Sequence, residues 1–190
     1  MTASDTLTGG FAEMPVQSAR AFRAALNAMA RPGRIEAISG AAPPAPLSPA
    51  AGTLLLTLTD HETPVHLAPS HDTPALRNWL TFHTGAPLSQ PGEATFAVGD
   101  WAALQPLERF RIGVPEYPDR SATLVVEMDA LEAGGARLTG PGIKGEAALS
   151  LPDVVALQKN ALLFPLGLDF YFTAGERLAA LPRTTRVEAG

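Results

Sequence analysis

The chain has 190 residues, a formal net charge of −5 and no cysteine. These values exclude disulfides and thiolate chemistry, and no cluster of basic residues is present to bind nucleic acid. Charged residues make up only 17% of the chain, against roughly 25% in an average domain. We therefore expect either apolar surface that a partner covers or a large Leu/Ala core. No apolar run is long enough to span a membrane and the N-terminus lacks a signal-peptide pattern, so a cytoplasmic protein is expected.

Residues 1–10 are predicted to form a flexible N-terminal arm, and residues 11–190 a single domain. The first predicted helix begins near Pro15 and ends by about residue 30, because Pro32 disfavours helical geometry in the residue before it. One apolar stripe follows the period of 3.6 residues along this helix. The stripe comprises Ala19, Phe22, Leu26 and Met29.

Two further helices begin with the same local signature, a capping side chain followed by proline. Ser48-Pro49 opens residues 50–60, for which a buried strand is the alternative, and Asp72-Thr73-Pro74 opens residues 75–85. Gly85 is a natural terminator of the second of these helices. A fourth helix is predicted over residues 151–163.

Apolar and β-branched runs predict strands over residues 94–98 and 121–131, and the proline-flanked residues 113–120 are expected to form a loop that carries Glu116. Residues 164–185 are typical of a hairpin with a turn at Ala174-Gly175. Strands therefore alternate with helices along the chain. This order predicts the α/β class, with a mixed sheet flanked by helices.

The two faces of the hairpin are predicted from strand alternation. Leu168, Phe170 and Phe172 share one face, and Asp169, Tyr171 and Thr173 the other. The second strand should end before Pro182, which cannot donate to a β-ladder. Arg183, Thr184 and Thr185 follow. This exit is interpreted as a solvated strand end or, alternatively, as a phosphate or phosphonate clamp.

Other polar residues also allow two interpretations. Arg31 and His83 lie at predicted helix C-termini, where a cation complements the helix dipole, or where either could contact a ligand. His61, His66 and His71 are spaced by five, which fits neither one helix face nor a zinc motif, so we interpret them as solvated loop and strand histidines and predict no metal site.

Several stretches, in this order, together resemble a known family. They are GFAEMPVQSARAFRAALNAMARPG, LLLTLTDHETPV, LTFHTGAP, ATFAVGD, SATLVVE, LTGPGI, FPLGLDFYF and LPRTT. Through these motifs the chain resembles the phosphonate metabolism protein family PhnH, which provides the H component of the bacterial carbon–phosphorus lyase core complex. The resemblance runs from about Gly10 to Val187.

The resemblance implies partners, a fold and a role. The partners are the G, I and J subunits of the carbon–phosphorus lyase complex, and the isolated protein resembles a homodimer. The implied fold resembles that of pyridoxal-phosphate-dependent transferases without the cofactor, and no other cofactor is implied. The implied role is to help the I component couple a phosphonate to the ribose of ATP with loss of adenine.

Two hypotheses follow for the function. The first is a non-catalytic accessory subunit, required by the complex rather than active as an enzyme alone. The second is a subunit that contributes a phosphonate or nucleotide site to a transferase. The candidate ligand-binding residues are Arg31, His83, Thr84, Glu116, Arg183 and Thr184. If this site exists, we expect Arg183→Ala and His83→Ala to leave folding nearly unchanged and to impair phosphonate use.

Overall fold

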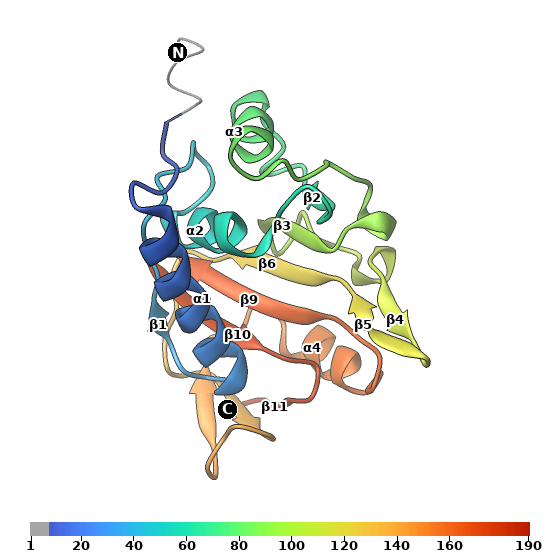
Figure 1. Ribbon diagram of the computed structural model, residues 1–190. Helices are drawn as coiled ribbons and strands as arrows, with labels where there is room; N and C mark the ends of the chain where they lie inside the picture. The colour runs from blue at the N-terminus through green and yellow to red at the C-terminus, as the bar shows by residue number, and fades with distance from the viewer. Residues whose placement is uncertain (1–7) are drawn as a thin grey trace.

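The computed structural model describes residues 8–190, in which a six-stranded mixed sheet forms the centre of the molecule (Figure 1). Its strand order is β1–β10–β9–β6–β3–β2. Strands β2, β3, β6 and β9 are parallel, whereas β10 and β1 pair antiparallel. The strand bounds are Glu36–Ala37 for β1, Val65–Leu67 for β2, Phe96–Asp100 for β3, Thr123–Glu127 for β6, Asp169–Ala174 for β9 and Arg177–Leu181 for β10. The predicted α/β class with a mixed sheet is confirmed.

Four α-helices accompany the sheet within residues 8–190: α1 (Met14–Ala30), α2 (Pro49–Leu58), α3 (Pro74–Thr84) and α4 (Val154–Ala161). The side chains of Ser48 and Thr73 cap α2 and α3 by accepting hydrogen bonds from Ala51 N and Leu76 N. The predicted cap-and-proline signatures are confirmed, and the stretch predicted over residues 50–60 forms a helix rather than a strand, although the helix ends at Leu58. No helix in this part of the chain is long and apolar enough to cross a membrane.

Helix α1 buries a different face from the one that its large apolar residues predict. The buried side chains are Ala21, Ala24, Ala25 and Ala28. Phe22 and Leu26 are 52% and 55% exposed, so the predicted stripe largely faces solvent. The physical reason is that small alanine side chains let α1 approach α2 and β10 closely, so that the bulky side chains point outward.

Two hydrophobic clusters cover the two faces of the sheet. Tyr171 and Val125 belong to the cluster under α1, α2 and α3, whereas Phe170 and Phe172 belong to the cluster on the opposite face. The predicted alternation of the β9 side chains is therefore confirmed. Burial raises the pKa of Tyr171 to about 12, and its hydroxyl donates to Ala25 O over 3.4 Å.

The β9–β10 hairpin also turns and ends as predicted. Gly175 has a φ of 58° in the turn, and β10 ends at Leu181, directly before Pro182. Residues 113–120 were expected to form a loop, but most of them form a second hairpin. Gly113, with a φ of 83°, accommodates a bulge in it. Pro118 has no backbone N–H, and it is tolerated because a two-stranded ladder leaves many backbone N–H groups unpaired. This hairpin consists of β4 (Ile112–Val114) and β5 (Tyr117–Ser121).

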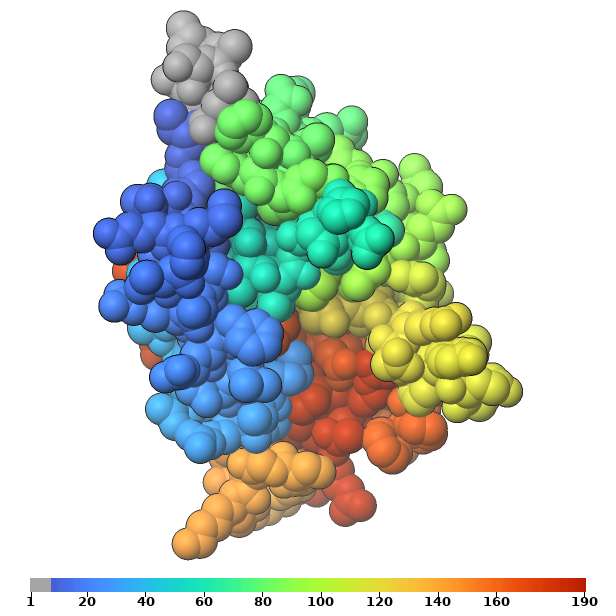
Figure 2. Space-filling model, in the orientation of Figure 1, coloured from blue at the N-terminus to red at the C-terminus, as the bar shows by residue number. Residues whose placement is uncertain are grey.

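A three-stranded antiparallel sheet completes the fold, with the order β11–β7–β8. Its bounds are Ala136–Thr139 for β7, Ala147–Leu149 for β8 and Arg186–Glu188 for β11, and two 3-10 turns span Pro91–Glu93 and Leu107–Arg109. The β4–β5 hairpin and the loop between β7 and β8 project from the body of the molecule (Figure 2).

The predicted N-terminal arm is described only in part, since residues 1–7 lie outside the described residues. Residues 8–10 contact the body of the protein. Trp79 donates its indole N–H to Thr8 O over 3.0 Å, and Ala42 N donates to Gly9 O over 2.8 Å.

Candidate functional site

A cleft with a volume of about 610 Å³ lies beside the edge strand β2. Strand β2 contributes His66, helix α3 contributes Arg77, and the residues between α3 and β3 contribute Ser89 and Glu93. Arg109, at the end of a 3-10 turn, completes the polar lining. Four separate segments therefore place polar side chains around one volume, and such a cleft is a common form of ligand site.

His66 and Arg109 form a hydrogen-bonded pair with a defined proton arrangement. Arg109 Nη2 lies 2.7 Å from His66 Nε2, and His66 Nδ1 lies 3.0 Å from Ser89 O. A guanidinium only donates, so Nε2 must accept and Nδ1 must carry the hydrogen that it donates to Ser89 O. Burial, together with the charge of Arg109, lowers the pKa of His66 below its usual value. His66 is therefore neutral at pH 7 and anchors one end of the guanidinium.

Two polar atoms, both buried and both on residues that line this cleft, have no hydrogen-bond partner among residues 8–190. They are Arg109 Nε and Ser89 Oγ. Buried donors are nearly always satisfied in folded proteins, and each one left unpaired costs about 1–3 kcal/mol. The cleft thus holds hydrogen-bonding capacity that the protein itself does not use.

The wall formed by α3 carries an ion pair. Arg77 Nε and Nη2 both contact the carboxylate of Asp72, in a bidentate arrangement at the start of the helix. The hydrogen bond from Arg77 holds the pKa of Asp72 below its usual value. This pair contributes no net charge, so Arg109 and Glu93 are the remaining charges of the cleft.

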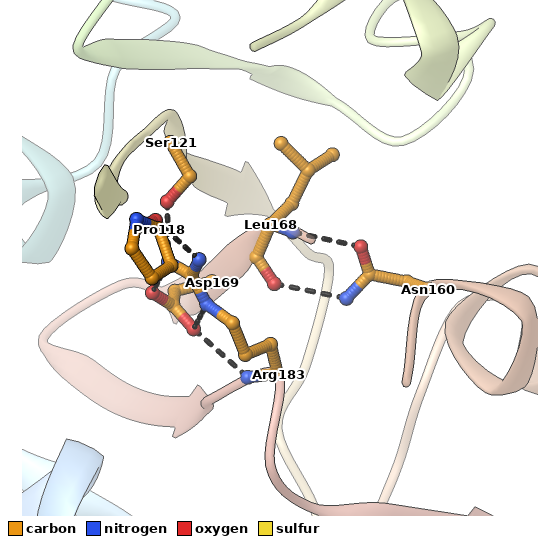
Figure 3. Close-up of polar contacts among 6 residues, drawn as sticks. All are labelled: Pro118, Ser121, Asn160, Leu168, Asp169 and Arg183. Atoms are coloured by element: carbon orange, nitrogen blue, oxygen red, sulfur yellow. Dashed lines mark hydrogen bonds and ion pairs between the residues drawn. The ribbon is translucent and has the colours of Figure 1, made fainter. Parts of the chain in front are cut away.

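Arg183, one of the predicted ligand residues, is instead engaged by the protein (Figure 3). Its side chain is 11% exposed, and its Nε donates to Asp169 Oδ1 over 3.1 Å. Nη1 donates to Pro118 O over 2.8 Å, while Nη2 contacts both Ser121 Oγ and Asp169 Oδ2. The guanidinium therefore ties the β4–β5 hairpin to the start of β9.

A neighbouring side chain fixes the same strand. Asn160 of α4 donates to Leu168 O over 2.9 Å and accepts from Leu168 N over 2.8 Å (Figure 3). Next to Arg183, the exposed Thr184 lines a small pocket of about 320 Å³ together with Phe164 and Arg186. Two of the predicted residues, the sequence neighbours Arg183 and Thr184, line this pocket.

The other predicted residues lie elsewhere. The His83 ring packs against Trp79 and Phe82 at centroid distances of 5.2 and 5.0 Å. Thr84 Oγ1 donates to Leu80 O over 2.8 Å and accepts from Ala86 N over 3.0 Å, so it caps the end of α3.

Arg31 and Glu116 are both exposed, the first at the C-terminus of α1 and the second in the turn between β4 and β5. The end of α1 packs against the loop between β7 and β8, since a Cβ on Gly142 would lie 2.0 Å from Ala30 O. None of the six predicted residues lines the cleft beside β2.

The sequence interpretation therefore missed His66, Ser89 and Arg109. His66 was interpreted as a solvated histidine because its spacing fits no ligand motif. Arg109 lies 43 residues further along the chain, and no local pattern links the two positions. Only the tertiary fold places them together.

Comparison with known proteins identifies the family to which this chain belongs. A family model described as "Bacterial phosphonate metabolism protein (PhnH)" matches residues 9–188. The chain belongs to the PhnH family. Its relatives include the "Alpha-D-ribose 1-methylphosphonate 5-triphosphate synthase subunit PhnH" of Rhizobium meliloti (strain 1021), which is 43% identical over 99% of each chain. Another is the "Putative C-P lyase subunit protein HtxG" of Stutzerimonas stutzeri, 32% identical over 88% of this chain and 84% of the relative. The resemblance to PhnH inferred from the motifs is thereby confirmed.

Proposed function

We propose that this protein is an accessory subunit of the bacterial carbon–phosphorus lyase core complex. It would support phosphonate catabolism by helping the I component couple a phosphonate to the ribose of ATP with loss of adenine. The observation that carries this proposal is the 43% identity, across 99% of both chains, to a relative named as a synthase subunit. Identity at this level over the full length supports a shared role.

The surface supports a protein that associates with others. Large apolar side chains are exposed on α1 and after α4, among them Phe22, Leu26 and Phe164. Apolar side chains left in water favour association because contact with a partner removes them from solvent. We propose the G, I and J subunits as partners, a homodimer for the isolated chain, and the cytoplasm as the location. The resemblance of the fold to pyridoxal-phosphate-dependent transferases belongs to the same proposal.

A second candidate function is the contribution of a small-molecule site for phosphonate or nucleotide. The pocket around Thr184 favours it, because Arg186 lines that pocket beside an exposed threonine hydroxyl. Arg183 also lines this pocket, but its guanidinium is already hydrogen-bonded to Asp169 and to Pro118 O.

The accessory role is tested by reconstitution. The G, I and J subunits are purified with and without this chain, and the coupling of methylphosphonate to the ribose of ATP is measured by adenine release. We expect the chain to co-purify with its partners and adenine release to require it. Full activity in its absence, or failure to co-purify, would contradict the proposal. Loss of activity in Thr184→Ala with normal co-purification would favour the second candidate.

A further inference from the structure

We propose that the cleft between β2 and Arg109 binds a phosphate-type oxyanion, with Arg109 and Ser89 as its donors. This inference goes beyond the accessory role, and it concerns none of the residues assigned to that role. It rests on the atoms that the fold leaves without partners, on the way Arg109 is held, and on the balance of charge around it.

The unpaired atoms are the first argument. Arg109 Nε and Ser89 Oγ are buried and find no partner among residues 8–190, and the residues that carry them both line the same cleft. A single orphaned donor can be an isolated imperfection of packing. Here two residues of one cavity carry such groups, a guanidinium N–H and a hydroxyl, and both can donate to an acceptor.

The fixed orientation of Arg109 is the second argument. His66 Nε2 accepts from Nη2 over 2.7 Å, and Gln105 O accepts from Nη1 over 3.4 Å. The guanidinium is also 5.3 Å from the centroid of the Phe110 ring. Arg109 is thus held in one orientation while its Nε–H has no partner in the described chain, and a preorganised donor loses little entropy when it binds. His66 acts as a positioning residue, since it contacts the arginine and not the anion.

The charges around the cleft decide which anion fits. Asp72 and Arg77 neutralise each other, His66 is neutral, and Glu93 opposes the charge of Arg109. A balanced cleft disfavours a highly charged polyphosphate, because several negative charges would face one available cation. Its volume of about 610 Å³ exceeds that of a lone oxyanion. We therefore infer that the ligand is a small organic molecule with a single phosphate or phosphonate group.

The test is a titration of the full chain with inorganic phosphate, methylphosphonate, acetate and ATP at constant ionic strength, because screening alters exposed charges. Binding is followed by calorimetry and by the amide NMR signals of Ser89 and of Gln90, which also lines the cleft. Phosphate and methylphosphonate should shift these signals and bind more tightly than acetate and ATP. Equal binding of acetate, tighter binding of ATP, or no shift at the cleft would overturn the proposal.

Variants show whether the two donors are used. Arg109→Gln should weaken phosphate binding by about tenfold or more, and Ser89→Ala by about threefold, since charged donors contribute more than neutral ones. Arg120→Gln is the matched control, because it removes the same charge from an exposed arginine that packs on Tyr117 outside the cleft. An equal loss in Arg120→Gln, or none in Ser89→Ala, would overturn the proposal. Ser89→Ala is a minor change, so the test stands even if Arg109→Gln fails to fold.

Discussion

Arg183 and Arg109 are both partly buried arginines, and the protein treats them differently. Around Arg183, a carboxylate, a hydroxyl and a carbonyl oxygen engage Nε and both terminal nitrogens of the guanidinium. Around Arg109, a neutral histidine and a distant carbonyl hold two nitrogens, and Nε remains buried without a partner in the described chain. The first arrangement stabilises the fold, and the second leaves capacity for a ligand. The residue type alone does not distinguish the two roles; the surrounding acceptors do.

The largest effect should come from Arg183→Ala. Its removal leaves the Asp169 carboxylate without its cation and frees the β4–β5 hairpin, so we expect a loss of about 3 kcal/mol in the free energy of unfolding. This geometry revises the expectation that Arg183→Ala spares the fold. Urea denaturation measures the loss, with the exposed Arg186→Ala as control, which should change stability by no more than about 0.5 kcal/mol. If Arg183→Ala were as stable as Arg186→Ala, the assignment of Arg183 to the stability of the fold would be contradicted.

Asn160→Ala should have the next largest effect. The substitution leaves both backbone groups of Leu168 buried without their side-chain partners, which should cost about 2 kcal/mol. Chemical denaturation gives the value, and Gln158→Ala on the same helix serves as a milder control because it removes a single bond, to Val187 O. A smaller loss for Asn160 than for Gln158 would show that the region around Arg183 is less constrained than its contacts indicate.

Arg109→Gln should cost about 1 kcal/mol, clearly less than Arg183→Ala. It loses the bonds to His66 and Gln105 O, but it also removes a buried N–H that was unpaired, and the two changes partly offset each other. The measurement is the unfolding free energy in a buffer without phosphate or sulfate. A loss as large as that of Arg183→Ala would assign Arg109 to the fold and not to a ligand.

The smallest effect concerns pH. The pKa values of His66 and His71 are lowered by burial, so the unfolded chain takes up protons before the folded chain does. Their contribution to stability is complete above about pH 6.5 and is lost as pH falls through the lower folded pKa values. Burial raises the pKa of Glu127, which acts in the opposite direction at lower pH.

Denaturation at pH 7.5 and at pH 5.5 tests this effect. The wild type should be less stable at pH 5.5, and His66→Gln should reduce the difference. His61→Gln is the control, because His61 is an exposed histidine. An equal pH difference in His66→Gln and wild type would contradict the neutral His66 that anchors Arg109.

Much of the fold could be predicted because its signals are local. The caps at Ser48 and Thr73 and the turn at Gly175 each depend on a few adjacent residues, and each forms as expected. The buried face of α1 could not be predicted in this way, since the helix carries one apolar face of small side chains and another of large ones. Only the approach of α2 and β10 selects the alanine face.

The candidate site depended still less on local pattern. His66 and Arg109 are far apart in sequence. Arg183 looked like a free cation because its partners lie at distant positions, Asp169 in β9 and Pro118 and Ser121 in β5. Family motifs did carry the identity, because their order along the chain is itself a long-range signal.

The contrast between the two arginines is tested most directly by the free energy of unfolding of three proteins: wild type, Arg183→Lys and Arg109→Gln. Each is measured without phosphate and with phosphate at ten times the Kd of the wild type for phosphate. Binding to the folded state should add about 1.4 kcal/mol at that concentration. We predict that Arg183→Lys is less stable than wild type yet keeps the full gain, and that Arg109→Gln is closer to wild type yet loses it. A gain that survives in Arg109→Gln, or vanishes in Arg183→Lys, would contradict the assignment of one arginine to the fold and the other to a ligand.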